Sequence, residues 1–284
     1  MPVCVVTFFA YTPAYKGFYG VAVVRVVHCL VLFALSCCAA QSLWAAQVVK
    51  VGAYNYPPYV LKAESEQPQG LLPDLLAVLN QQQNDYHFEL VPTSVTRRYR
   101  DFQHARFDII MFESAAWGWQ DIALTNLDLQ VEDADIYVAK AEPGRTQAYF
   151  EQLKGKRLAL YTGYHYGFAN YNADPEYLTR EFNAMLNYSH ESNLLMVQRG
   201  RADITVVTRS YLHSFERMFP EQRAQLLTSS KADQIYHHEA LLRPQAPINS
   251  ATLGALLQQL RSEGLLGKLY AQYQLRPLGS IAQH

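Results

Sequence analysis

The stretch FDIIMF, residues 107–112, is an apolar run that directly follows a helix-forming segment, RRYRDFQHAR (97–106). Two similar runs precede it, VVKVGAY (48–54) and HFELVPT (87–93), and between these two GLLPDLLAVLNQQQ (70–83) has apolar residues at helical spacing. The order is therefore strand, helix, strand, helix, strand. That order is typical of a parallel sheet covered by helices, so the sequence predicts an α/β lobe.

The same order starts again after a polar connector that contains proline and glycine. The expected elements are the connector AEPGRTQ (141–147), a strand in LKGKRLALYTG (153–163), helices in DPEYLTREFNAMLNYS (174–189) and ESNLLMVQRG (191–200), and a strand in ADITVVT (202–208). A second set this soon after the first predicts a second lobe rather than one long sheet.

The rest of the chain contains one strand, YHHEALLRP (236–244), and a long amphipathic helical region at 249–274. This part has no sheet of its own, so we expect it to cross back to the first lobe. Two crossings between two α/β lobes form a hinged pair with a cleft between them. The predicted division is a signal peptide at 1–46, a first lobe at 47–138 and 233–275, a second lobe at 139–232 and a C-terminal tail at 276–284.

The first 46 residues contain two basic residues, Lys16 and Arg25, and no acid. An apolar run and small residues follow Arg25, which is the layout of a secretory signal peptide, with cleavage expected after Ala40 or Ala45. The alternatives are an uncleaved membrane anchor and a translation start near Val24. All four cysteines, Cys4, Cys29, Cys37 and Cys38, lie in this segment, so we expect a mature periplasmic chain without disulfides, and lipidation at Cys37 or Cys38 is a minor option.

The charge pattern and the known motifs exclude several kinds of site. The chain has 24 Lys and Arg against 25 Asp and Glu, which argues against nucleic acid as a partner. His237 and His238 adjoin Glu239, but neighbours on a strand point to opposite faces, so no metal site is expected there. A phosphate loop and a Gly-x-Ser-x-Gly elbow are both absent from the sequence, and no cofactor is expected.

Several segments in order resemble the bacterial periplasmic solute-binding proteins of family three, the amino-acid-binding type. The segments that carry the resemblance lie between about Val48 and Tyr273 and are VKVGAYNYPPYV, GLLPDLLAVLN, RFDIIMFESA, LKGKRLALYTGYHYG, RGRADITVV and LLQQLRSEGLLGKLYAQY. The resemblance implies a two-lobed periplasmic-binding-protein fold (type II) with two hinge strands and a cleft. It also implies a monomer that closes on a small ligand and delivers it to an ABC permease.

The resemblance also locates two charge anchors for an α-amino acid, and both are missing. The family has an Arg for the α-carboxylate twelve residues past the Asp of the third strand, and counting from Asp108 that position is Gln120. The acid for the α-ammonium lies five residues past the Asp of the second lobe's strand, and counting from Asp203 that position is Thr208. A neutral side chain does not replace either charge, so we expect a ligand other than a standard α-amino acid.

Arg97 is a candidate substitute for the lost arginine. It lies eleven residues before Asp108, after Pro92, and a subgroup of the family has an Arg at that spacing. In the cleft it would bind an anion. The alternative is that Arg97, Arg98 and Arg100 form a solvated face, an alternative favoured for Arg98 and Arg100 over Arg97.

Aromatic residues dominate the segments just past the strands, where open α/β sheets bind ligands. With Glu113 they suit a cation or a flat ring, whereas the alternative for each ring, and for Trp119 in particular, is packing in the core. The predicted ligand-binding residues are Tyr54, Tyr56, Tyr59, Arg97, Phe112, Glu113, Ser114, Trp117, Gln120, Tyr164, His165, Tyr166 and Thr208.

Three functions fit these features. The first, which we favour, is capture of a small solute by hinge closure for an ABC transporter, without catalysis. The second is a periplasmic sensor that signals to a membrane partner. The third is a dehydratase-like enzyme in which Glu113 and His165 act as an acid–base pair.

Overall fold

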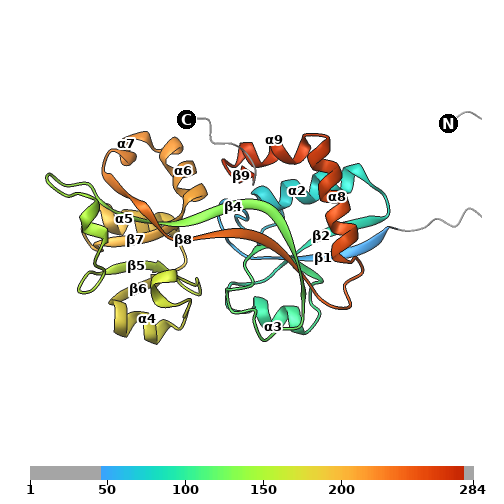
Figure 1. Ribbon diagram of the computed structural model, residues 1–284, viewed down its shortest axis with the longest axis horizontal. Coiled ribbons are helices and arrows are strands. Elements are labelled where there is room, and N and C mark those ends of the chain that lie inside the picture. Colours follow the sequence, from blue (N-terminus) through green and yellow to red (C-terminus); the bar gives the residue numbers. More distant parts are fainter. Residues whose placement is uncertain (1–45, 278–284) are drawn as a thin grey trace, which may run out of the picture. The chain divides into compact units, whose positions relative to one another are not determined.

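The computed structural model describes residues 46–277 (Figure 1). The predicted signal peptide, with Cys37 and Cys38, lies outside the described residues except for Ala46, and so do residues 278–284. Between residues 46 and 277, no helix is both long enough and apolar enough to cross a membrane.

The first lobe has a parallel three-stranded core in the order β2–β1–β3. Helix α2 lies against it with five buried leucines at helical spacing, which is why GLLPDLLAVLN folds as a helix here. The elements of this lobe are β1 (Gln47–Ala53), α2 (Leu71–Gln82), β2 (Tyr86–Pro92), α3 (Arg98–Gln103), β3 (Ile109–Glu113), α8 (Ser250–Ser262) and α9 (Leu265–Gln272).

The second lobe repeats the plan with β5 between β6 and β7, all parallel. Its helices begin at side-chain caps, since Asp174, Ser189 and Thr208 each accept a hydrogen bond from a backbone N–H of the first turn. The elements are η1 (Gln147–Phe150), β5 (Leu158–Tyr161), η2 (Gly167–Ala169), α4 (Pro175–Phe182), β6 (Ala184–Asn187), α5 (His190–Gln198), β7 (Ile204–Thr208), α6 (Arg209–Met218) and α7 (Pro220–Arg223).

Two long antiparallel strands, β4 (Thr125–Lys140) and β8 (Leu226–Leu242), run through both lobes (Figure 1). β8 pairs with β3 in the first lobe and β4 pairs with β7 in the second, so the strands form one continuous hydrogen-bonded path. A short strand, β9 (Arg276–Pro277), pairs with β4 at Val131 and Glu132. The predicted two lobes with two hinge strands are confirmed, whereas the continuous path between the lobes was not expected.

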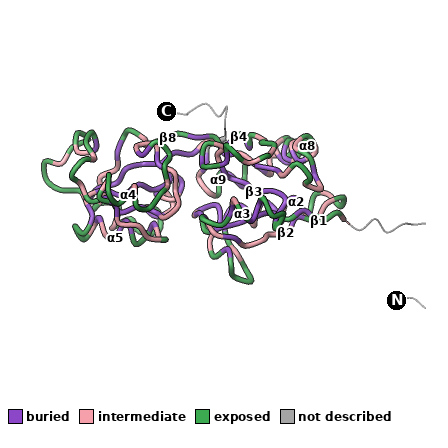
Figure 2. The backbone as a smooth tube through the Cα atoms, turned by 90° about the horizontal axis from the view of Figure 1, so that it is seen from below, coloured by how far each residue is buried: buried purple, intermediate pink, exposed green. Residues whose placement is uncertain are grey.

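The buried side chains form separate cores on the two sides of the hinge, as the buried strands in Figure 2 illustrate. The core of the first lobe draws on residues between Val49 and Val131 and between Tyr236 and Leu275, whereas the second lobe has clusters between Ala134 and Phe215. On β4 the change from one core to the other therefore falls between Val131 and Ala134. The domain bounds given above from the sequence stay predictions.

Three local expectations differ from the structure. Residues 184–187, expected in a helix, form β6, because Asn183 adopts a left-handed conformation (φ 50°) that ends α4. Two hinge strands were expected, but residues 125–140 were not identified as one of them, since the first half of β4 is mostly exposed and rich in polar residues. Arg98, for which a solvated position was favoured, is only 2% exposed.

Candidate functional site

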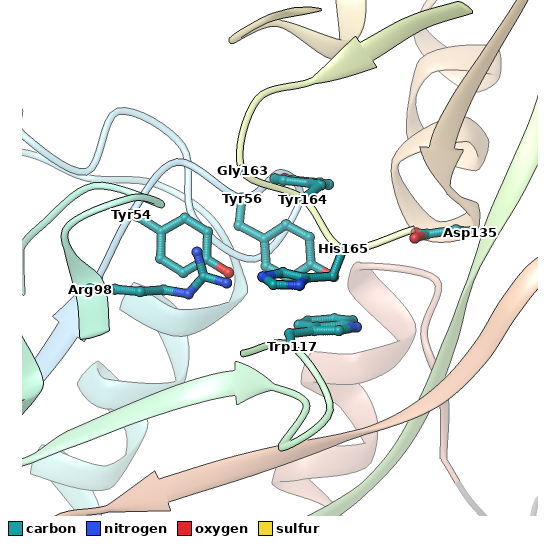
Figure 3. A pocket seen from close by; sticks show the side chains of 8 residues that line it. All are labelled: Tyr54, Tyr56, Arg98, Trp117, Asp135, Gly163, Tyr164 and His165. Carbon is teal, nitrogen blue, oxygen red and sulfur yellow. The ribbon is translucent and has the colours of Figure 1, made fainter. Parts of the chain in front are cut away.

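A small cavity lies where the two lobes and the hinge strands meet (Figure 3). Its volume is about 20 Å³, room for about one water molecule. Cavities that hold a small-molecule ligand are typically about 300–1,000 Å³, so this cavity is too small for such a ligand in this arrangement of the lobes. The lining residues are Tyr54, Tyr56, Arg98, Trp117, Asp135, Gly163, Tyr164 and His165.

Aromatic side chains from opposite lobes meet across the cavity. Tyr56 follows β1 and Tyr164 follows β5, and their rings lie edge to face with centroids 5.6 Å apart. Trp117, from the loop after β3, also meets Tyr56 edge to face, at 6.2 Å. The Tyr164 hydroxyl is buried without a hydrogen-bond partner among residues 46–277. Loops at the ends of strands in both lobes therefore bring the rings together, as the sequence predicted for open α/β sheets.

Gly163 lets the second lobe approach the first this closely. Its φ of 80° is in the left-handed region, and a Cβ there would lie 3.1 Å from Cγ1 of Val95 in the first lobe. A side chain at this position would therefore strain the backbone and crowd the contact between the lobes.

Arg98 lines the cavity from the first lobe as half of a buried ion pair. Its Nε lies 3.2 Å from Oε1 of Glu113, and the two side chains are 2% and 0% exposed. The guanidinium also lies over the rings of Tyr54 and Tyr99, at 5.0 and 4.4 Å from their centroids. The other carboxylate oxygen of Glu113, Oε2, accepts a hydrogen bond of 2.9 Å from Nε1 of Trp119. The positive charge of Arg98 is therefore already balanced within the first lobe.

His165 is held in the cavity wall through both ring nitrogens. Nε2 lies 2.9 Å from the Tyr99 hydroxyl of the first lobe, and Nδ1 lies 2.6 Å from the Tyr171 carbonyl oxygen. Burial lowers the pKa of His165 to about 4, so the imidazole is neutral at physiological pH. A neutral histidine with both nitrogens engaged orients the two lobes and adds no charge to the cavity.

Asp135 lines the cavity from the hinge strand β4 and is 5% exposed. Its carboxyl accepts hydrogen bonds from Nε2 of Gln234 at 2.7 Å and from the Tyr236 hydroxyl at 3.3 Å. Gln234 also links both lobes to the hinge, since it donates to the His165 carbonyl oxygen and accepts from Nε1 of Trp117. Burial raises the pKa of Asp135 to about 8, and nearby Asp233 and Asp133 add to this rise.

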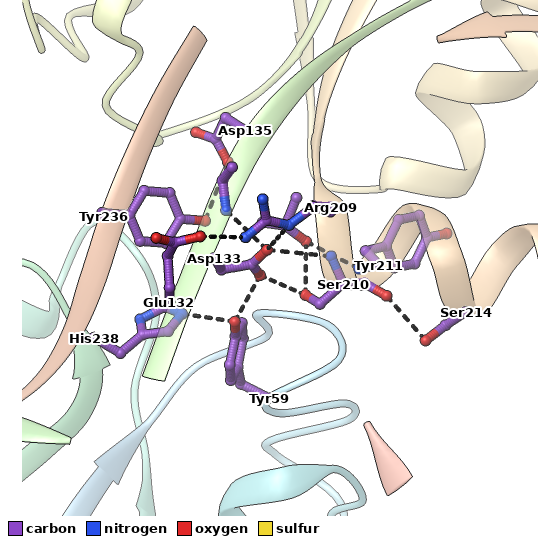
Figure 4. Close-up of polar contacts among 12 residues, drawn as sticks. Tyr59, Glu132, Asp133, Asp135, Arg209, Ser210, Tyr211, Ser214, Tyr236 and His238 are labelled. Carbon is purple, nitrogen blue, oxygen red and sulfur yellow. Dashed lines mark hydrogen bonds and ion pairs between the residues drawn. The ribbon is translucent and has the colours of Figure 1, made fainter. Parts of the chain in front are cut away.

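A second polar network ties the lobes together beside the cavity (Figure 4). The Tyr59 hydroxyl of the first lobe donates to Oδ2 of Asp133 at 2.6 Å, and Ser210 of the second lobe donates to the same oxygen at 2.5 Å. Nε2 of His238 lies 2.6 Å from the Tyr59 hydroxyl. The network is buried and joins both lobes to both hinge strands, so it stabilises this arrangement of the lobes.

The predicted site residues divide into three groups by position. Tyr54, Tyr56, Trp117, Tyr164 and His165 line the cavity. Four others are buried in the cores behind it, namely Tyr59, Phe112, Glu113 and Tyr166. Four lie elsewhere, namely Arg97, Ser114, Gln120 and Thr208. Their ligand-binding roles stay predictions.

The four residues outside the cavity have other partners in this structure. The Arg97 side chain is 49% exposed and lies 4.0 Å from Glu64. Ser114 lines a separate surface hollow, and Gln120 donates to the Ala116 carbonyl oxygen. Thr208 caps α6 by accepting from the Tyr211 N–H, and it pairs with Asp135 across β7 and β4.

Sequence reasoning missed three lining residues, Arg98, Asp135 and Gly163. A glycine just past a strand, next to predicted site tyrosines, was an available signal for Gly163. The spacing taken from the resemblance favoured Arg97 over Arg98, and Asp135 lies in β4, whose residues were not identified as a strand from the sequence. Among residues 46–277, no three His, Cys, Asp or Glu side chains gather to hold a metal ion.

No protein-family model matches this sequence, and neither does any curated protein. Solved structures do match. The GluR0 ligand-binding core complexed with L-glutamate is 15% identical, with a TM-score of 0.62 over 81% of this chain and 99% of that one. An ancestral amino acid-binding protein described as a precursor of cyclohexadienyl dehydratase is 17% identical, with a TM-score of 0.59 over 80% and 94%.

A third match is the putative binding component of an ABC transporter from Wolinella succinogenes, complexed with lysine. It is 19% identical, with a TM-score of 0.60 over 79% of this chain and 94% of that one. The TM-scores establish a similar arrangement of the helices and strands. Identities this low leave the ligand of this chain open. This chain therefore has the two-lobed, hinged α/β fold of the periplasmic amino-acid-binding proteins.

Proposed function

We propose that this chain is a periplasmic solute-binding protein related to family three, which captures a small ligand by hinge closure for an ABC transporter. The observation that carries the proposal is the cavity at the junction of both lobes and both hinge strands, lined by rings from each lobe. Hinge closure around a ligand is the usual motion of two-lobed proteins of this type.

The closed cavity supports capture by opening and closing rather than by diffusion into a preformed pocket. A space for about one water molecule cannot admit a solute, so the lobes have to separate first. A ligand that then replaces the contact between Tyr56 and Tyr164 would also give the Tyr164 hydroxyl a partner. An unpaired buried polar group costs about 1–3 kcal/mol, so this partner would favour the ligand-bound closed form.

The geometry gives less support to an enzyme. The proposed acid–base pair needs Glu113 and His165 together at the cavity, but Glu113 is 0% exposed and bound to Arg98 and Trp119. His165 lines the cavity with both ring nitrogens already engaged. We therefore infer ligand binding without catalysis.

A thermal-shift screen of amines, amino acids, aromatic acids and small neutral compounds tests the proposal. We expect at least one compound to raise the midpoint of unfolding, because a ligand that binds only the folded state stabilises it. Trp117→Leu should abolish that rise, whereas Phe219→Leu, a matched change at a 38% exposed ring outside the cavity, should preserve it. No stabilisation by any compound, or equal stabilisation of both variants, would count against the site.

A further inference from the structure

Residues 46–277 contain five buried acids, and four of them pair with an arginine. The pairs are Asp101 with Arg106, Asp108 with Arg243, Glu113 with Arg98, and Asp133 with Arg209. Asp135 is the fifth, and among residues 46–277 it forms no ion pair. It is also the one of the five that lines the cavity.

The partners of Asp135 are neutral, since both the Gln234 amide and the Tyr236 hydroxyl are uncharged donors. Burying a carboxylate without a cation is costly, so the group avoids ionisation until a positive charge arrives. The raised pKa of Asp135, about 8, agrees with this reading. Asp135 is therefore a buried acid without a cationic partner among residues 46–277.

The rings next to Asp135 suit a positive charge as well. Tyr56 and Trp117 line the same cavity, and the Trp117 and Tyr236 rings lie 4.8 Å apart, edge to face. Aromatic faces attract an organic cation by about 0.5–2 kcal/mol per ring when water is excluded. A carboxyl among such rings is the chemistry that recognises an ammonium group.

At the opposite end of the cavity, Arg98 needs no anionic group of a ligand to balance its charge. Figure 3 shows Arg98 and Asp135 at opposite ends of the row of rings. The positive charge of Arg98 is balanced by Glu113. Glu113 is fully buried and also accepts a hydrogen bond from Trp119. A ligand carboxylate would therefore gain little at Arg98, and the site as a whole prefers a cation over a zwitterion.

We propose that Asp135 is the acid that contacts the ligand and that the ligand carries a small organic ammonium group, held between Asp135 and the rings of Tyr56 and Trp117. This inference rests on the proposed function, since it names the ligand class of the same cavity. Asp135 on the hinge strand β4 thus takes the cation-binding role that was predicted from the sequence for Glu113.

Binding of a cation to this site is coupled to loss of a proton. At pH 7 most Asp135 carboxyls are protonated, so a bound ammonium group displaces close to one proton. The titratable and charged groups near Asp135 are Asp133, Asp233, Tyr236, Tyr56, Tyr59, Tyr137 and Tyr166, with Arg98 and His165 across the cavity. The tyrosines and His165 stay neutral between pH 6 and 8, whereas burial raises the pKa of Asp133 and of Asp233 as well, so the variant Asp135→Asn isolates the share of Asp135 in the coupling.

The test compares cations with uncharged compounds of the same shape. The probes are choline with dimethylbutanol, phenethylamine with phenylethanol, and putrescine, measured by titration calorimetry at pH 7 in two buffers of different ionisation enthalpy. We expect at least one cation to bind about tenfold or more tightly than its uncharged analogue and to release close to one proton. Below pH 8, its affinity should fall about tenfold per pH unit.

Two variants identify the residue. Asp135→Asn should weaken the cation about tenfold or more and remove the proton release. Asp121→Asn is the matched control, because Asp121 is exposed, lies outside the cavity lining and does not contribute to the raised pKa of Asp135. It should keep both the binding and the proton release.

The possible failures are distinguishable. Tighter binding of an uncharged or anionic compound than of any cation, or full binding by Asp135→Asn, overturns this inference and leaves the proposed function standing. No binding by any compound in this set or in the wider thermal-shift screen overturns the proposed function and the inference with it.

Discussion

Arg98 and Glu113 form a buried ion pair in the wall of the cavity, with Nε and Oε1 3.2 Å apart and neither side chain more than 2% exposed. Glu113 closes β3, and Arg98 begins α3. The pair joins α3 to β3 at the wall of the cavity. Its role is to hold the first lobe's half of the site in place.

Glu113→Gln should therefore act on stability first. Removing one partner leaves a buried uncompensated guanidinium, which costs about 3–5 kcal/mol of unfolding free energy. Urea unfolding of the ligand-free protein measures this loss. A double variant, Arg98→Met with Glu113→Leu, is the control, because apolar replacement of a whole buried pair is often neutral. A single variant with wild-type stability and no ligand binding would instead assign Glu113 a direct role at the ligand.

His190→Phe should stabilise the protein. His190 is 2% exposed, packs 4.9 Å from the Tyr161 ring, and has no hydrogen-bond partner within residues 46–277 at either ring nitrogen. Replacing it with a ring of similar size should remove a desolvation cost of about 1–3 kcal/mol. His237→Phe, at an exposed position on β8, should change stability by less than about 0.5 kcal/mol.

The gain from His190→Phe should also depend on pH. Burial lowers the pKa of His190 to about 3 from 6.5, so below pH 6.5 the unfolded chain binds a proton that the native protein does not. The contribution of His190 to the unfolding free energy of the wild type therefore falls as pH drops, by up to about 1.4 kcal/mol per pH unit. The difference between variant and wild type should grow from pH 7 to pH 5 in urea unfolding. A constant difference would mean that the imidazole is not buried in neutral form.

Asp135→Asn should stabilise the ligand-free protein with the opposite pH dependence. The folded pKa is raised to about 8 from 3.8, so the stabilising contribution of the protonated carboxyl is complete below pH 3.8 and is lost as pH rises toward 8. The variant should be close to wild type near pH 4 and gain stability as pH increases. Unfolding in urea at several pH values measures this trend. A variant less stable than wild type at pH 8 would contradict the assigned pKa and its cause.

The alternation of apolar runs and amphipathic segments was enough to predict the two lobes. The rule that ligands bind at strand ends was enough to gather five cavity residues, including Tyr56, Trp117 and Tyr164. Both predictions rest on features that repeat along the chain. They therefore do not require high sequence identity to known structures.

The residues that decide the charge of the site could not be predicted in the same way. α3 has six residues, too few for a periodic pattern that would separate buried Arg98 from exposed Arg97. Phe112 has a φ of 62° at a bulge in β3, which breaks the alternation and buries both Phe112 and Glu113. Asp135 lies in the hinge strand β4. Polar residues in this strand obscure the apolar alternation by which a strand is identified from sequence.

The most direct measurement is the distance between the lobes with and without ligand. Residues 47–284 contain no cysteine, so Glu66→Cys in the first lobe and Glu176→Cys in α4 of the second provide two exposed spin-label sites. A second pair in the first lobe alone, Glu66→Cys with Ala255→Cys, is the control and should not change. We predict that the distance between the interlobe labels is longer without ligand than with it. The best ligand of the thermal-shift screen should shift the distance distribution to shorter values. A single interlobe distance, unchanged by a ligand that binds, would contradict capture by hinge closure.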